Sequence, residues 1–328
     1  MNASNTSAPQ DTAQVPPATG VAAVHAASEV IAVPAHPAAP AVPAARPLLA
    51  VGLIALASAL VAMTTVLAKA LGTPVLGAPL HPLQITNGRF LFALGAVALV
   101  AAAVRAPFTR PALPLHALRA VCGFSTVTLM FMAATLIPLA DATAISFLSP
   151  VVTLVLAGLI LRERVGRWRW IATLIALSGA FVLLRPGEGA MSLGAVAALG
   201  AALFMGLELT IIKRLSGREP LLQILLLANV FGLILSSVAV LPVWRMPTPG
   251  QWLALWALGT LMLGAQMCYT AAMKRADASF VAPVGYTTLI FAAVYDIAIF
   301  SVWPDLVSVA GAGLILAGAL VLTTRAQR

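Results

Sequence analysis

The sequence has few charged residues. Only 9% of its 328 residues are Asp, Glu, Lys or Arg, whereas 61% are hydrophobic, and the mean hydropathy is +1.01. Soluble globular domains carry about 25% charged residues, so this composition excludes an ordinary soluble protein. Apolar runs begin near Leu48 and recur almost to the C-terminus, separated by short polar breaks. This pattern predicts an all-α polytopic membrane protein.

Cysteine and histidine are also scarce. The two cysteines, Cys122 and Cys268, both lie in apolar segments, and neither has a CxxC or other metal-ligand spacing. Two of the four histidines precede residue 46, and the other two, His81 and His116, lie near predicted helix ends. We therefore expect no disulfide framework, no metal site and no cofactor.

A formal net charge of +9 and a pI near 10.8 do not indicate a nucleic-acid-binding protein. The basic residues lie between hydrophobic runs, where they determine the orientation of membrane helices. The first 46 residues are rich in Ala, Pro, Thr and Ser and contain no Lys or Arg before Arg46. We expect a disordered tail over 1–46 rather than a signal peptide.

A membrane span needs roughly 20 apolar residues, and this criterion predicts ten helices. They cover 48–70, 84–104, 114–136, 141–161, 168–185, 192–212, 221–241, 251–273, 278–301 and 305–324. With the N-terminus inside, the basic residues assigned to the cytoplasmic side are Arg46, Arg105, Arg110, Arg119, Arg162, Arg164, Arg167, Arg169, Lys213, Arg214, Arg218, Lys274, Arg275, Arg325 and Arg328. Only Lys69, Arg185 and Arg245 fall outside. This bias predicts that both termini are cytoplasmic.

Residues 48–185 and 192–324 each contain five predicted helices and share short phrases. "ADA" recurs after 136 positions, "SFxxPV" after 133, and "GAxVL" near the end of each half after 139. Because five is odd, the two halves would have opposite orientations in the membrane. The sequence therefore predicts two inverted five-helix repeats.

The stretch "LADATAISFLSPVVTLVLAGLILRERVGRWRWIATLIALSGAFVLLRP" resembles the EamA-type branch of the drug/metabolite transporter superfamily, as does "KRADASFVAPVGYTTLIFAAVYDIAIFSVWPDLVSVAGAGLILAGALVL". The phrases "HPLQITNGRF" and "VAPVGYTTLI" most resemble ten-helix carriers of riboflavin or S-adenosylmethionine. The resemblance implies inverted repeats and a central cavity that opens alternately to each side. It also implies an acidic residue after the fourth helix of each half; Glu163 fits the first position, but Val302 occupies the second.

Three charged residues within predicted spans are candidates for function, because charge in the bilayer is costly and usually faces a cavity or a partner. Arg89 lies in the second helix and shares a face with Thr86, and this face could bind an anionic or amide-bearing substrate. Glu208, in the middle of the sixth helix, is a candidate for proton coupling, as is Asp296 in the ninth. The alternatives are a static ion pair between Arg89 and one of these acids, snorkelling of Arg89 to an interface, and a solvated or capping role for Asp296.

Further polar and aromatic residues could bind a planar metabolite. The residues proposed for substrate binding, besides Arg89, are Gln84, Asn87, Gln266, Tyr269 and Tyr286, and Tyr295 has a similar character. The alternative for each is helix packing or an interfacial position. Gln266 and Tyr269 share a helix face.

These features favour a secondary active transporter over an enzyme. Such a transporter would move a small polar metabolite across the inner (plasma) membrane by alternating access. A vitamin-like or nucleoside-like substrate, such as riboflavin or S-adenosylmethionine, is the first hypothesis, and export of amino acids or related metabolites is the alternative. A channel, a membrane scaffold and an intramembrane enzyme are hypotheses of another class. No GxxxxGK[ST] motif occurs, so a gradient would supply the energy. The expected partners are a metabolite, the lipid bilayer and, optionally, a second copy in a homodimer.

Overall fold

The computed structural model describes residues 47–105, 108–153, 167–184, 192–216, 218–273 and 284–325, and these residues form helices and connections without any strand. Within these described ranges, six helices are long and apolar enough to cross a membrane. They are α2 (Pro47–Gly72), α3 (Pro82–Val104), α4 (Leu113–Leu136), α8 (Leu193–Ser216), α9 (Leu221–Val240) and α10 (Pro249–Met273). Helices suit this environment because they satisfy their own backbone hydrogen bonds.

Four shorter apolar helices occupy the remaining predicted ranges. They are α5 (Leu139–Ser146), α7 (Arg167–Leu184), α12 (Thr287–Phe300) and α13 (Leu306–Arg325). Two 3₁₀ turns, η1 (Pro74–Leu76) and η2 (Leu241–Val243), follow α2 and α9. The all-helical architecture is confirmed in the described residues, while the count of ten spans stays a prediction.

The fourth predicted helix, 141–161, differs from the structure. α5 begins at Leu139 and ends at Ser146, and after a turn at 147–148 the chain is helical again to residue 153. The turn ends two residues before Pro150, whose ring and missing N–H disfavour a continuous helix. Residues 154–166, with Glu163, and 278–283, at the start of the ninth predicted helix, lie outside the described residues.

Proline marks the start of several helices. Pro82 occupies the first turn of α3, where the His81 ring nitrogen Nδ1 accepts a hydrogen bond from the Leu83 N–H at 3.3 Å. Pro220 directly precedes α9, and Pro138 directly precedes α5. Proline suits these positions because the first N–H groups of a helix have no intrahelical partner.

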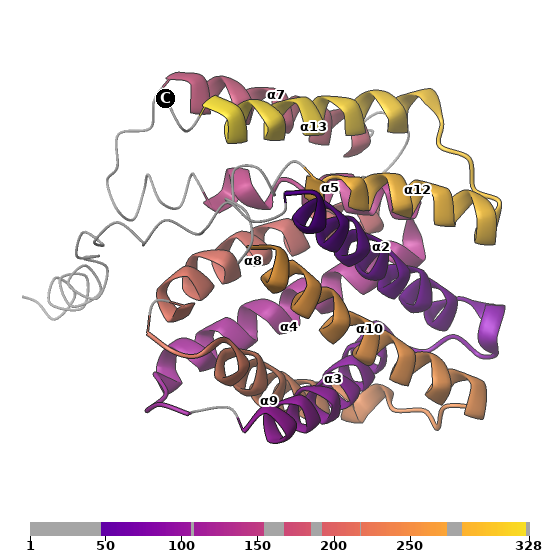
Figure 1. Ribbon diagram of the computed structural model, residues 1–328. Coiled ribbons are helices and arrows are strands. Elements are labelled where there is room, and N and C mark those ends of the chain that lie inside the picture. The colour runs from indigo at the N-terminus through magenta and orange to yellow at the C-terminus, as the bar shows by residue number, and fades with distance from the viewer. Residues whose placement is uncertain are drawn as a thin grey trace, which may run out of the picture.

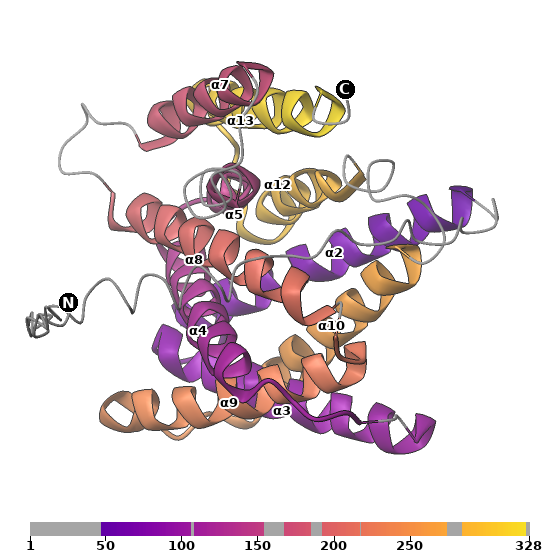
Figure 2. The ribbon, with the colours of Figure 1, turned by 90° about the vertical axis from the view of Figure 1, so that its left-hand side faces the viewer.

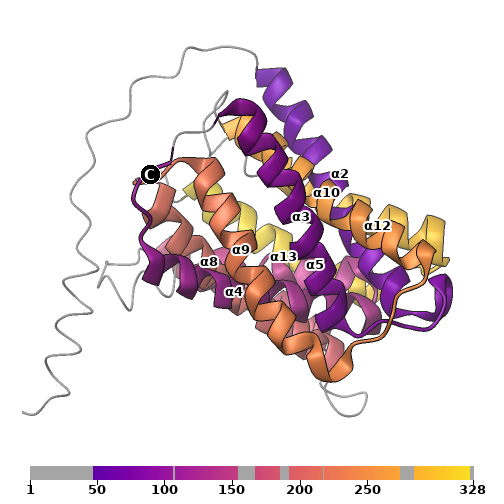
Figure 3. The same ribbon diagram turned by 90° about the horizontal axis from the view of Figure 1, so that it is seen from below.

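The helices form layers with a pair of helices at each edge (Figure 1). α7 and α13 pack side by side at one edge, and α3 and α9 pack together at the opposite edge (Figure 2). Between them lie α5 and α12 and, next to α3 and α9, the larger group of α2, α4, α8 and α10. Seen from below, α3 and α9 lie in front of the rest of the bundle (Figure 3).

The packing of the two halves is reciprocal. α4 of the first half packs against α8 and α9 of the second, and α10 of the second half packs against α2 and α3 of the first. Pro82 and Leu221, the first residues of α3 and α9, are 139 positions apart. Arg167 and Leu306, the first residues of α7 and α13, have the same separation. This is the offset found in the terminal phrase of the sequence.

Close contacts between α7 and α13 follow the same relation. A Cβ atom at Gly179 would lie 2.6 Å from the carbonyl oxygen of Gly311, and one at Gly318 would lie 2.7 Å from the carbonyl oxygen of Ala172. Gly318 is 139 positions after Gly179, and Gly311 is 139 positions after Ala172. The same contact therefore occurs twice with the halves exchanged. Both glycines allow the two helix backbones to approach closely.

Candidate functional site

Arg89 lies in α3 and is buried, with 7% of its surface exposed. The centre of its guanidinium group lies 4.5 Å from the ring centroid of Phe90. Within the described residues, its side chain forms no hydrogen bond. Thr86, predicted to share its face, accepts a hydrogen bond from the Thr128 hydroxyl of α4 at 3.1 Å. Arg89 is therefore a buried cation whose nitrogen atoms have no hydrogen-bond partner in the described part of the chain.

Gln84 and Asn87, the other candidates on α3, join helices in this structure. The Gln84 amide pairs with the backbone of Arg245: its Oε1 accepts from the Arg245 N–H at 3.2 Å, and its Nε2 donates to the Arg245 carbonyl. Asn87 Nδ2 donates to the hydroxyls of Ser236 at 3.2 Å and Ser237 at 3.0 Å, both on α9. The structure does not bring these two amides together with Arg89.

Glu208 of α8 forms an ion pair with Arg119 of α4, with Oε1 and Nη2 3.4 Å apart. Arg119 also donates from Nη1 to the carbonyl of Ile224 at 3.2 Å. Gly123, one turn further along α4, leaves room for the Glu208 carboxylate, because a Cβ atom there would lie 3.2 Å from Oε1. Arg89, Arg119 and Glu208 are close enough to interact electrostatically.

The assignment of Arg119 to a cytoplasmic connection is therefore corrected. This residue lies in the second turn of α4 and is buried. It also lies within the predicted helix 114–136, three residues after His116, so helical spacing could have indicated a polar face there. Counting basic residues between spans treated it as a surface charge instead.

Asp296 of α12 pairs with Lys69 of α2 rather than with Arg89. Lys69 Nζ lies 2.6 Å from Asp296 Oδ1 and 4.6 Å from the ring centroid of Phe300. The second carboxylate oxygen of Asp296 accepts a hydrogen bond from the backbone N–H of Leu139, the first residue of α5, at 2.5 Å. This group joins α2, α5 and α12 at what we call the Lys69 end, where α2 ends and α3 begins.

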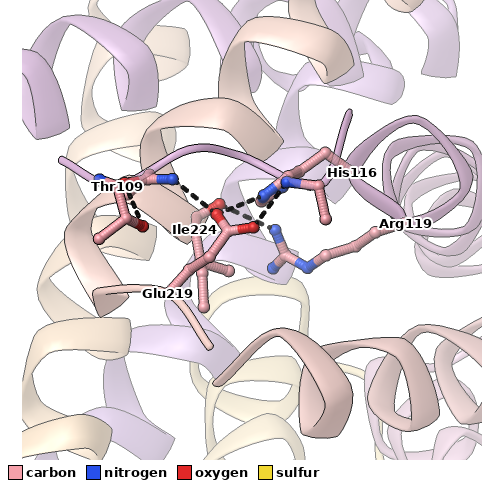
Figure 4. A network of polar contacts seen from close by, with 7 residues as sticks. Thr109, His116, Arg119, Glu219 and Ile224 are labelled. Carbon is pink, nitrogen blue, oxygen red and sulfur yellow. Dashed lines mark hydrogen bonds and ion pairs between the residues drawn. The ribbon is translucent and has the colours of Figure 1, made fainter. Parts of the chain in front are cut away.

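A second polar network lies where α4 and α9 begin, which we call the Glu219 end (Figure 4). The Glu219 carboxylate accepts from the Ala112 N–H at 2.8 Å and contacts His116 Nε2 at 2.9 Å. Gln223 donates to Glu219 at 2.7 Å and accepts from the Thr109 N–H at 2.7 Å. The sequence did not indicate this network, because its members come from segments more than 100 residues apart.

The ionised state of Glu219 is favoured by these neighbours. Burial alone would raise the pKa of Glu219. Its neighbours outweigh burial and lower the pKa below the ordinary value of 4.5: the Ala112 N–H donates a hydrogen bond, His116 adds a hydrogen bond and a charge, and Gln223 donates another hydrogen bond. Glu219 lies in the connection between α8 and α9. It is therefore a carboxylate that joins this connection to the start of α4.

The remaining candidates lie on the second half. Tyr269 of α10 is 48% exposed, and Gln266 is half-buried. Tyr286 packs edge to face against Phe147, with ring centroids 5.1 Å apart. Within the described part of the chain, no hydrogen bond joins these residues to Arg89 or Glu208.

Comparison with known proteins identifies the family. The model of the EamA-like transporter family matches this chain twice, at residues 48–185 and 192–324. The chain belongs to the EamA-like transporter family. It is thus a multi-pass membrane protein of the drug/metabolite transporter superfamily, which points to a transporter rather than an enzyme.

Curated relatives are transporters with different names. The chain is 35% identical to the riboflavin transporter of Vibrio cholerae over 159 residues, which cover 47% of this chain and 52%, about half, of that protein. It is 26% identical to the S-adenosylmethionine uptake transporter of Rickettsia prowazekii, in a match that covers 75% of this chain and 84% of the relative. It is 29% identical to the pseudopaline exporter CntI of Pseudomonas aeruginosa, in a match that covers 66% of this chain and 76% of the relative.

A solved crystal structure has the same fold. It superimposes on this chain with a TM-score of 0.58 at 19% sequence identity, covering 87% of this chain and 100% of the other.

Proposed function

We propose that this EamA-like protein is a secondary active transporter that moves a small polar metabolite across the inner membrane by alternating access, with both termini in the cytoplasm. The observation that carries the proposal is Arg89, a buried cation with no hydrogen bond among the described residues, which is close enough to the Arg119–Glu208 pair to interact with it electrostatically. Charged residues within membrane helices that lack a full set of partners mark substrate pathways.

The reciprocal packing of the two halves supports alternating access. In transporters built from inverted repeats, the substrate site lies near the midplane, and one half can rock against the other. The Lys69 end and the Glu219 end both carry contacts between the halves, so each would need to open in turn. We therefore infer that 48–185 and 192–324 act as two inverted repeats.

The residues receive the following roles in this proposal. Arg89 contacts the substrate, while Gln266, Tyr269 and Tyr286 line its path when the bundle rearranges. Gln84 and Asn87, which join α3 to the α9–α10 connection and to α9 in this structure, would release those bonds to reach substrate. Glu208 carries the coupling proton. Asp296, held by Lys69, would exchange a proton only when the Lys69 end opens.

A vitamin-like or nucleoside-like substrate is proposed first, since relatives carry the names riboflavin transporter and S-adenosylmethionine uptake transporter. Export of amino acids or related metabolites is the second candidate, and the relative named pseudopaline exporter favours it.

Uptake into proteoliposomes tests the proposal. Saturable uptake of labelled riboflavin, S-adenosylmethionine or an amino acid, accelerated by unlabelled substrate inside, is the expected result for a carrier. Flux without saturation would indicate a channel instead, and turnover without translocation would indicate an enzyme. Arg89→Ala should abolish uptake, and Glu208→Gln should flatten its pH dependence.

A further inference from the structure

The described residues near Arg89 do not neutralise its charge. Arg89 is close enough to both Arg119 and Glu208 to interact with them electrostatically. Arg119 and Glu208 already form a pair at 3.4 Å, which leaves the positive charge of Arg89 in excess. An unpaired charge is costly to bury, because protein and lipid solvate it poorly compared with water. A group of opposite charge is expected to occupy this place during function.

The contact of Arg89 with Phe90 leaves its hydrogen-bond donors without an acceptor among the described residues. The guanidinium carbon lies over the aromatic ring, 4.5 Å from its centroid, and the ring offers no lone pair to the N–H groups. The N–H donors of a guanidinium point outward in its own plane, where they match the two oxygens of a carboxylate or phosphate. Arginine suits such a site better than lysine because its donors are fixed in a planar fork.

We propose that Arg89 binds the carboxylate or phosphate group of the substrate, so that the transported metabolite carries at least one such anionic group; among the named candidates, S-adenosylmethionine and amino acids have a carboxylate, whereas riboflavin has neither group. This inference rests on the proposed transport function and narrows its substrate class. The Arg119–Glu208 pair has no net charge and leaves the site with one positive charge. Binding an anion neutralises the site, whereas a neutral molecule leaves the excess charge in place and a cation increases it.

Thermal unfolding in detergent separates a ligand site from a structural ion pair. Arg89→Met removes an unpaired buried charge, so the ligand-free variant should unfold about 3 °C above the wild type. Arg119→Met is the matched control; it leaves Glu208 buried without its partner and should lower the unfolding temperature. A decrease for Arg89→Met similar to that of the control would overturn the proposal, because it would mean that Arg89 stabilises the fold.

Small anions provide a probe that needs no knowledge of the natural substrate. At equal ionic strength, sodium acetate and sodium phosphate should raise the unfolding temperature of the wild type above its value in sodium chloride, because they bind the folded state. Neutral acetamide should not, and neither anion should stabilise Arg89→Met. The proposal is wrong if neither anion stabilises the wild type, or if both anions stabilise Arg89→Met as much as they stabilise the wild type.

The proteoliposome assay keeps this inference separate from the transport function. Saturable, counterflow-accelerated uptake of riboflavin or S-adenosylmethionine that Arg89→Met leaves unchanged would refute the anion site and leave the transporter standing. Anion binding that depends on Arg89, without saturable uptake of any anionic metabolite, would refute the transporter and leave the binding site standing. Saturable uptake of a carboxylate or phosphate compound, at least tenfold slower in Arg89→Met, would support both.

Discussion

The two ends of the bundle share a framework but differ in charge. At the Lys69 end, Gln84 in the first turn of α3 accepts a hydrogen bond from the backbone of Arg245; at the Glu219 end, Gln223 in the first turn of α9 accepts one from the backbone of Thr109. The two glutamines are 139 positions apart, the offset that relates the halves. Each one joins its own half to a connection of the other half.

The neighbouring positions differ. Leu80 and Leu255 belong to one apolar cluster at the Lys69 end. The position 139 residues after Leu80 is Glu219, and the position 139 residues before Leu255 is His116. Glu219 and His116 form the buried polar pair of the Glu219 end. Equivalent positions of the two halves thus carry apolar residues at one end and a buried polar pair at the other. The polar pair is therefore specific to the Glu219 end.

Breaking the polar contact should have the largest effect. Glu219→Leu leaves the buried His116 Nε2 and the partly buried Ala112 N–H without their partner, so we expect the free energy of unfolding to fall by about 3–5 kcal/mol. Leu80→Met, a change of similar volume at the apolar end, should cost less than about 1.5 kcal/mol. Unfolding by SDS in mixed micelles measures both. Equal losses would mean that the polar end has no special energetic role.

The shared framework is tested by the two glutamines. Gln84→Leu and Gln223→Leu each remove the side-chain acceptor of a backbone N–H in a partly buried hydrogen bond, and each should cost about 0.5–1.5 kcal/mol in the same assay. Similar losses are expected because the glutamines perform the same task in the two halves. A loss at only one of them would contradict the structural equivalence of the two ends.

The pH dependence of stability should distinguish the ends. Folding lowers the pKa of Glu219, so the ionised carboxylate contributes to the stability of the folded state. This contribution is fully present at pH values above the ordinary pKa of 4.5, and it is lost as the pH falls through the lower pKa of the folded state. Thermal unfolding of the wild type between about pH 6 and 3 should therefore show a decrease in stability that is smaller in Glu219→Gln. Leu80→Met is the control and should retain the full decrease. Parallel curves for the wild type and Glu219→Gln would exclude this titration.

Much of this architecture follows from local sequence. The helices were predicted because their apolar runs are long, and Arg89, Glu208 and Asp296 were identified because charge is rare within such runs. Partners were harder to predict: Asp296 pairs with Lys69, 227 positions away, and no local pattern specifies that pairing. Lys69 and Arg119 lie towards helix ends and resembled loop charges. Had the 139-residue offset been applied to the whole chain, it would have matched Gln84 with Gln223.

Exchanging the whole pair is expected to have the smallest effect. The double change His116→Leu and Glu219→Leu gives the Glu219 end the residue types of the Lys69 end, where Leu80 and Leu255 belong to one apolar cluster. Replacing a buried polar pair by apolar residues is often close to neutral, because both desolvation costs disappear together, and here only the Ala112 N–H and Gln223 lose a partner. The double variant should therefore be more stable than Glu219→Leu alone, as SDS unfolding would show. If it is as unstable as the single variant, the two ends are not equivalent in packing, and the leucines of the Lys69 end depend on neighbours that the Glu219 end lacks. If its stability is restored but uptake into proteoliposomes is slower, the polar pair serves the opening of that end rather than the fold.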